Sequence, residues 1–185
     1  KSHGDVLLYQ ALAQSYNLAS AQLGMQLGVN AVVDTLARLG VEEGVPRLPA
    51  LLLGAGEYSP MDMAAMYQTI AAGGFRMPLR SSRDIVGANG APPQRYPLES
   101  EPTVSLQSVL VLHFALRAVV REGTGHGAYR YLPESFAVAG KTGTTNDGRD
   151  SWFAGFSGDL LAVSWIGRDD NGVTGLTGGS GALKV

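Results

Sequence analysis

Apolar residues three and four positions apart predict helices through the first half of the chain. One helix is expected after Asp5, which can cap it, and a second after the polar break at 15–17. Asn30 is expected to begin a third helix that Gly40 ends. Residues 59–62 give the clearest start signal, since they combine a serine cap, a proline at the first helical position and an early acid. This fourth helix carries an apolar stripe that predicts core packing rather than a ligand surface: Met63, Met66, Tyr67 and Ile70.

Beyond Gly74 the pattern changes to short extended segments around one long helix. Residues 84–90 predict a small hairpin, and 91–102 a proline-containing surface loop. The long helix is expected over Thr103 to Glu122. A tight turn at 157–159 predicts that the last two strands are antiparallel. We expect three strands, over residues 136–144, 151–156 and 160–168. The order of elements indicates the α+β class, with a helical cluster followed by an antiparallel sheet and no second-domain boundary.

Composition narrows the function only slightly. Of the 185 residues, 45% are apolar and 16% charged, which is typical of a globular domain. The formal net charge of −2 gives no electrostatic reason to bind nucleic acid. No apolar run is long enough to cross a bilayer, and because residue 1 is Lys1 rather than Met, we expect a boundary set by processing or truncation. The three histidines lack metal-ligand spacing, so we expect neither a metal nor a cofactor, and His113 is expected to be a packing residue.

Lys141-Thr142-Gly143-Thr144-Thr145 is the strongest chemical signal. Alternate side chains of a strand share a face, so Thr142 and Thr144 should point together and Lys141 the other way. Two hydroxyls on one face can bind a single carboxylate, and Gly143 leaves room for an extended ligand to pair with the strand. The N–H of Thr144 could donate to an oxyanion. The alternative is a surface strand with a solvated lysine, because short motifs also match by chance.

Ser15-Tyr16-Asn17 is the second candidate. Residues two apart on a helix do not face each other, so Ser15 and Asn17 can reach one site only from a non-helical turn. The break between two helical patterns at this point provides such a turn. A serine near a lysine can pass a proton, and an asparagine amide can both donate to and accept from a peptide group. The alternative is helix capping by one of the two residues.

In this order, the two motifs and their flanks resemble the bifunctional, class A penicillin-binding proteins, most closely the Gram-negative 1b type. The likeness runs collinearly from Asp5 to Ala182. The segments that carry it are 11–19, 51–55, 59–74, Arg121-Glu122-Gly123-Thr124-Gly125, 139–145 and 152–156.

The resemblance implies a penicillin-binding transpeptidase fold of the serine β-lactamase-like kind, with a five-stranded antiparallel sheet, helices and a helical subdomain. The implied activity is D,D-transpeptidation, in which a serine attacks the bond between the two terminal D-alanines of a peptidoglycan stem peptide. An amine from a neighbouring stem then resolves the acyl-enzyme. The implied partners are stem peptides, the lipid-linked precursor, β-lactam antibiotics and cell-wall synthesis proteins, on the periplasmic side of the bacterial inner membrane.

The resemblance also implies roles for particular residues. Ser15 and Lys141 would move protons near the leaving nitrogen, while Asn17 would hold the donor's peptide amide. Thr142 and Thr144, on either side of Gly143, would bind the terminal carboxylate. The N–H of Thr144 would help to form the oxyanion hole.

Several family features lie outside these residues. The Ser-x-x-Lys motif that carries the nucleophile does not occur in the sequence. A glycosyltransferase domain, a membrane anchor and the final helix expected after Gly181–Ala182 are also missing. We therefore expect residues 1–185 to be the C-terminal part of a transpeptidase domain. This part is expected to be inactive alone and to depend on the N-terminal part of the same protein.

Two other functions are compatible with the sequence. A class A β-lactamase shares the motifs but needs a glutamate on a loop, usually with an asparagine four residues on. Glu42, Glu43 and Glu57 have no such partner. A non-catalytic β-lactam sensor or binding module is the other alternative. A Ser-x-x-Lys motif encoded upstream of Lys1 would argue against the sensor.

Overall fold

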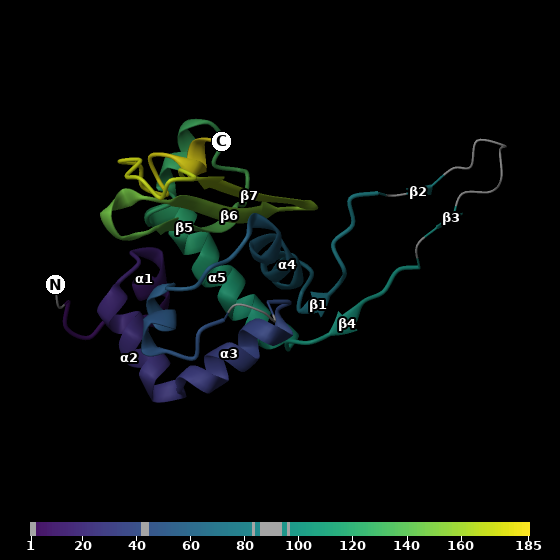
Figure 1. Ribbon diagram of the computed structural model, residues 1–185, viewed down its shortest axis with the longest axis horizontal. Coiled ribbons are helices and arrows are strands. Elements are labelled where there is room, and N and C mark those ends of the chain that lie inside the picture. Colours follow the sequence, from purple (N-terminus) through teal and green to yellow (C-terminus); the bar gives the residue numbers. More distant parts are fainter. Residues whose placement is uncertain (1–2, 42–44, 83, 86–93, 96) are drawn as a thin grey trace.

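The computed structural model describes residues 3–41, 45–82, 84–85, 94–95 and 97–185. A helical cluster leads into a small sheet, as the sequence predicts (Figure 1). The α-helices are α1 (Leu8–Ala13), α2 (Asn17–Leu27), α3 (Val29–Arg38), α4 (Pro60–Ala71) and α5 (Leu106–Glu122). Short 3₁₀ turns are η1 (Pro49–Leu53), η2 (His126–Arg130), η3 (Asn146–Gly148) and η4 (Ala182–Lys184). Among the described residues, no helix is long and apolar enough to cross a membrane.

The start of α4 agrees with the prediction. The Ser59 hydroxyl accepts from the Asp62 N–H at 3.2 Å, and the Asp62 carboxylate accepts from the Ser59 N–H at 2.8 Å. This reciprocal capping box satisfies two backbone donors that the helix itself leaves free.

Two other predicted helix starts are wrong. Asp5 does not cap α1, because the helix begins at Leu8 and its N-cap position is Leu7, which has no side-chain acceptor. The long helix α5 begins at Leu106 rather than Thr103. The reason is local, since the Ser105 hydroxyl accepts from the Ser108 N–H at 3.2 Å and so caps the helix there.

The main sheet is antiparallel, with the order β5-β6-β7. Its strands are β5 (Ala139–Thr144), β6 (Ser151–Ser157) and β7 (Leu160–Ile166), close to the predicted ranges. Lys141 lies opposite Ala154, and Gly143 lies opposite Trp152. The predicted antiparallel pairing of the last two strands is confirmed. The described residues form three strands of this sheet, against the five implied for the family's complete fold.

Two short strand pairs lie between α4 and α5 in the chain. β1 (Phe75–Arg76) pairs with β4 (Glu101–Pro102), and β2 (Asp84–Ile85) pairs with β3 (Gln94–Arg95) at the far end of an extension (Figure 1). The predicted strand at Asp84–Ile85 is confirmed, but the predicted turn over 87–90 lies outside the described residues. The loop predicted over 91–102 is wrong, because it contains β3 and β4. Two-residue strands are too short to show an alternating pattern.

The sheet lies between two packed layers (Figure 1). On one face, α4 and α5 form the main core with residues of β5, β6 and β7. Tyr67 and Ile70 are buried there, and Met63 and Met66 pack against them, so the predicted core stripe is confirmed. His113 also packs as predicted, with its Nε2 2.8 Å from the Ile70 carbonyl oxygen. On the opposite face, Val120, Ala128 and Val138 form a smaller cluster with Phe153 and Leu183.

Candidate active site

Ser15 occupies a sharp turn between α1 and α2. Its φ of +56° lies in the left-handed region, which is uncommon for a residue other than glycine. The Ser15 N–H donates to Leu12 O at 3.2 Å, and the Tyr16 N–H donates to Ala11 O at 2.9 Å, so these bonds close α1. α2 then begins at Asn17, whose side chain is exposed. The predicted non-helical break is therefore confirmed, and backbone strain of this kind often accompanies function.

The end of α5 holds this turn in place. The Thr124 N–H donates to Ala13 O at 3.1 Å, and the side-chain amide Nε2 of Gln14 donates to Glu122 O at 2.9 Å. Gly123 allows the close approach, because a Cβ at this position would lie 2.2 Å from the Ala13 carbonyl oxygen. α1 thus contacts the last turn of α5 directly, and the Ser15 turn is fixed relative to the sheet on which α5 packs.

Lys141 connects the two predicted motifs. Its Nζ donates to Ser15 Oγ at 2.9 Å and to the Thr142 carbonyl oxygen at 3.0 Å. Ser15 and Lys141 are 126 positions apart in the chain. Burial lowers the pKa of Lys141 from 10.5 to about 8, because desolvation disfavours the charged amine. A lysine with such a pKa can exchange a proton with a neighbouring hydroxyl near neutral pH.

The predicted alternation along β5 is also observed. Thr142 and Thr144 share the face opposite Lys141, and each hydroxyl contacts one protein group. Thr142 Oγ1 lies 2.5 Å from Thr124 Oγ1, and Thr144 Oγ1 accepts from the Gly178 N–H at 2.9 Å. Thr142 is 9% exposed, whereas Thr144 lies at the surface.

The outer edge of β5 is unpaired within the described sheet. The Thr145 N–H donates to Asp150 O at 3.2 Å, toward β6. Because backbone groups of successive strand residues point to opposite sides, the N–H and carbonyl of Thr142 and Thr144 point to the outer edge. Lys141 Nζ reaches the Thr142 carbonyl on that edge. Two backbone N–H groups are therefore available to an extended ligand.

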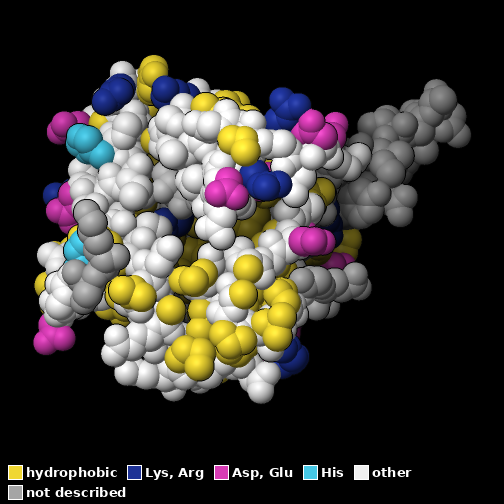
Figure 2. Space-filling view, turned by 60° about the vertical axis from the view of Figure 1, so that its left-hand side comes forward, with side chains coloured by type: hydrophobic (Ala, Val, Ile, Leu, Met, Phe, Trp, Pro, Cys, Tyr) yellow, Lys and Arg dark blue, Asp and Glu magenta, His cyan; other side chains and the backbone are white. Residues whose placement is uncertain are grey.

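A cleft of about 910 Å³ opens beside this strand. Lys141 to Thr145 line one side, and Trp152 and Trp165 continue that wall across β6 and β7. Met63, Met66 and Tyr67 of α4 line the cleft as well, although the sequence pattern indicates only core packing for them. Apolar side chains also gather on the neighbouring face that carries the N-terminal helices (Figure 2). Exposed examples are Leu18, Met25 and Leu27 of α2 and Leu53 of η1.

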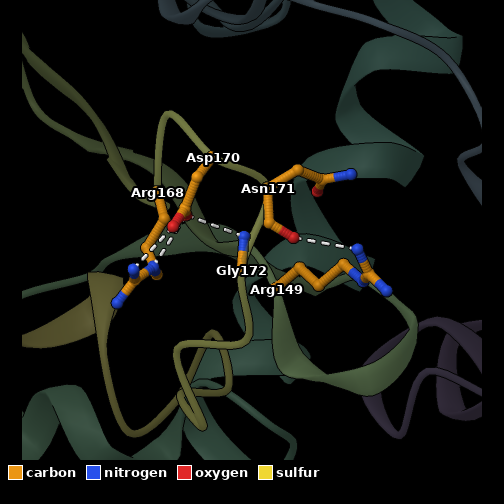
Figure 3. A network of polar contacts seen from close by, with 5 residues as sticks. All are labelled: Arg149, Arg168, Asp170, Asn171 and Gly172. Atoms are coloured by element: carbon orange, nitrogen blue, oxygen red, sulfur yellow. Dashed lines mark hydrogen bonds and ion pairs between the residues drawn. The ribbon is translucent and has the colours of Figure 1, made fainter.

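A polar network stabilises the turn after β7 (Figure 3). The Arg168 guanidinium donates to both Asp170 carboxylate oxygens, at 2.8 and 2.7 Å, and this contact holds the pKa of Asp170 down to about 2. Arg149 Nη1 donates to the Asn171 carbonyl oxygen at 2.8 Å and so ties this turn to the segment after β5. None of these four residues lines the cleft beside β5. Among the described residues, no group of three or more His, Cys, Asp or Glu residues could hold a metal.

Sequence reasoning did not assign a role to Thr124 or Gly178, which hold the two threonine hydroxyls of β5. Thr124 lies in the Gly123-Thr124-Gly125 segment, which the family resemblance already marks. A threonine between two glycines after a long helix was therefore an available signal. Gly178 gave none, because its contact with Thr144 spans 34 positions.

The comparisons with known proteins agree with this geometry. The family model "Penicillin binding protein transpeptidase domain" matches residues 1–165. The chain is 45% identical to "Penicillin-binding protein 1B" of Vibrio cholerae, covering 98% of this chain and 23% of that protein. It is 39% identical to "Penicillin-binding protein 1B" of Escherichia coli, covering 98% of this chain and 22% of that protein. The chain thus spans less than a quarter of the length of these relatives.

A solved structure also shares the fold. The penicillin-binding protein PonA1 from Mycobacterium tuberculosis superposes with a TM-score of 0.84 at 23% identity. The match covers 98% of this chain and 52% of that one. The α+β transpeptidase fold expected from the sequence is therefore confirmed.

Proposed function

The chain belongs to the penicillin-binding protein transpeptidase family, and from that premise we propose that it forms the C-terminal part of a D,D-transpeptidase domain that cross-links peptidoglycan. One observation carries this proposal. Lys141 Nζ donates to Ser15 Oγ at 2.9 Å beside a strand edge that no other described strand pairs with, so a proton-transfer pair lies next to a site for an extended peptide.

The nucleophile comes from another part of the same protein. No Ser-x-x-Lys motif occurs in the 185 residues, whereas the curated relatives are more than four times as long as the matched region. The cleft beside Lys141 is lined by Met63, Met66 and Tyr67, which suits an apolar helix face. We place the segment with the nucleophilic serine in this cleft, and the glycosyltransferase domain and membrane anchor elsewhere in the complete protein.

The reaction is an acyl transfer in two halves. The serine Oγ attacks the carbonyl carbon between the two terminal D-alanines, and its proton passes through Lys141 and Ser15 to the leaving nitrogen. Free D-alanine departs and a seryl ester remains. The amine of a neighbouring stem peptide then attacks the ester carbonyl, the bond to the serine oxygen breaks as the new peptide bond forms, and the proton lost by the amine returns to the serine oxygen.

The outer edge of β5 can both bind the substrate and stabilise the charge that develops during the reaction. The N–H of Thr144 points to this edge and can donate to the oxyanion that forms on the attacked carbonyl. The hydroxyls of Thr142 and Thr144 bind the terminal carboxylate, with Gly143 between them leaving space. Asn17, exposed at the start of α2, holds the donor's peptide amide.

The partners follow from this activity. Stem peptides and the lipid-linked precursor are the substrates, and β-lactam antibiotics acylate the same serine. Other cell-wall synthesis proteins act together with the enzyme. The site of action is placed on the periplasmic side of the bacterial inner membrane, as the resemblance to class A penicillin-binding proteins implies.

A labelling experiment on the complete protein tests the proposal. Ser15→Ala should lower the rate of labelling by a fluorescent penicillin by about 10²-fold, a typical contribution of a proton-transfer group. Ser20→Ala, an exposed serine on α2, is the matched control and should label at the wild-type rate. If Ser15→Ala labelled as fast as the control, Ser15 would have no part in acyl transfer.

A further inference from the structure

Thr124 follows the end of α5 and contacts both the end of α1 and strand β5. Its N–H donates to Ala13 O, two residues before Ser15, and its side chain contacts Thr142 of β5. The segment also has little freedom to move, because the Gly123 and Gly125 N–H groups both donate to Val119 O, at 3.1 and 3.0 Å. The Thr124 hydroxyl is therefore held at a fixed place beside β5.

The contact between Thr124 and Thr142 joins two hydroxyls, so one of them donates and the other accepts. Each hydroxyl has one proton. A carboxylate accepts hydrogen bonds but has none to donate, so a threonine that binds it must give its own proton to the ligand. Thr142 can do so only if its oxygen accepts the proton of Thr124.

Thr144 shows the same arrangement through a different partner. Its Oγ1 accepts from the Gly178 N–H at 2.9 Å, which leaves the hydroxyl proton of Thr144 free to donate. A backbone N–H can only donate, so the direction of this bond is fixed. With Thr124 as the donor, both threonines of β5 accept from the protein and present their protons to one ligand.

We propose that Thr124 is a positioning residue for carboxylate recognition, donating its hydroxyl proton to Thr142 Oγ1 and so directing the Thr142 proton toward the ligand. The inference rests on the proposed function, since it assigns part of the site that binds the terminal carboxylate of the acyl donor. Thr124 acts through Thr142 and does not itself touch the ligand.

Two variants of Thr124 in the complete protein separate this role from a structural one. Thr124→Val keeps the shape of the side chain and the N–H that donates to Ala13 O, but removes the hydroxyl. Thr124→Ser restores the hydroxyl. The readout is the acylation rate for a penicillin with its free carboxylate and for the carboxamide of the same penicillin.

We expect Thr124→Val to slow acylation by the free carboxylate about tenfold, as for one hydrogen bond to a charged group, and to leave the carboxamide rate nearly unchanged. Thr124→Ser should recover most of the loss. Equal losses for both ligands, or no recovery with serine, would overturn the proposal.

A double-mutant cycle tests the order of the two hydroxyls. If Thr124 acts through Thr142, then Thr124→Val should have no further effect in a Thr142→Val background. A full additional loss in that background would mean that Thr124 binds the carboxylate directly, and the proposal would be wrong. The wild-type protein reports on the underlying function separately, because a wild type that no penicillin acylates would refute the transpeptidase assignment itself.

Discussion

Ser15 Oγ lies 2.9 Å from Lys141 Nζ, although one residue belongs to a turn between two helices and the other to a strand 126 positions later. The turn is held by the end of α5, through bonds to Ala13 and Gln14, and the strand packs against the same helix. α5 therefore sets the distance between the two groups. Proton transfer is efficient only within hydrogen-bond reach, so in the proposed mechanism this helix would position the proton-transfer pair.

Substitution of Lys141 should show whether its amine takes part in catalysis. In the complete protein, Lys141→Ala should lower the acylation rate by about 10²–10³, as for loss of a preorganised electrostatic partner. Lys141→Arg should lose less, because it keeps the positive charge, but cannot recover fully because a guanidinium does not release its proton. The measurement is the rate of labelling by a fluorescent penicillin. A near-normal rate for Lys141→Ala would show that the Lys141 amine takes no part in acylation.

The pH dependence of acylation should follow Lys141. Burial lowers its pKa from 10.5 to about 8, so the amine loses its proton at a lower pH than an exposed lysine does. Acylation that uses the neutral amine as a base should rise with pH and level off above about pH 8. Acylation rates measured from about pH 6 to pH 9 test this. The acylation rate of Lys141→Arg should not rise with pH over this range. A wild-type rate that stayed constant over the same range would contradict the role of Lys141 as the base.

Gly123→Ala should disturb the Ser15 turn from a distance. The added Cβ would lie 2.2 Å from the Ala13 carbonyl oxygen, which is backbone and cannot move aside easily. A displacement of Ser15 by about 1 Å can cost roughly 10²-fold in rate. Gly127→Ala is the matched control, because its Cβ would lie 3.3 Å from the Leu183 side chain and 4.0 Å from the backbone oxygen of Gly179. Equal acylation rates for the two variants would show that the turn tolerates the shift.

The sequence predicted the parts of the site that depend on local patterns. The interrupted helical period located the Ser15 turn, and strand alternation placed Lys141 on the face opposite Thr142 and Thr144. The capping box of Ser59 and Asp62 is equally local. In each case the structural signal lies within a few consecutive residues, so tertiary packing was not needed to find it.

Contacts between distant segments could not be predicted in this way. The hydroxyl pair of Thr124 and Thr142 exists because α5 ends against both α1 and β5. β4 pairs with β1 next to a close approach of Gly74 to Val104, where a Cβ on Gly74 would lie 2.1 Å from the Val104 carbonyl oxygen. The cleft-lining role of Met63 and Met66 likewise requires the position of the sheet relative to α4.

Replacing both threonines of β5 tests carboxylate recognition as a whole. Thr142→Val combined with Thr144→Val should weaken ligands that have a free terminal carboxylate and spare their amidated counterparts. Each hydroxyl bonded to a charged group contributes roughly 1.5–3 kcal/mol. Acylation rates for the two ligand types give the ratio directly. Equal losses for both types would instead indicate disturbed packing against Thr124 and Gly178.

The acyl-enzyme should be long-lived in the absence of an acceptor amine. Deacylation by water needs a general base within about 3 Å of the attacking oxygen, directly or through one water. Glu57 lines the cleft, but it lacks the asparagine partner expected of a hydrolytic glutamate. We therefore expect the complete protein to hold a penicilloyl group for minutes to hours, and Glu57→Gln to leave that lifetime unchanged. The measurement is release of labelled penicilloate after rapid removal of free drug. Turnover within seconds that Glu57→Gln abolished would identify a β-lactamase in place of a transpeptidase.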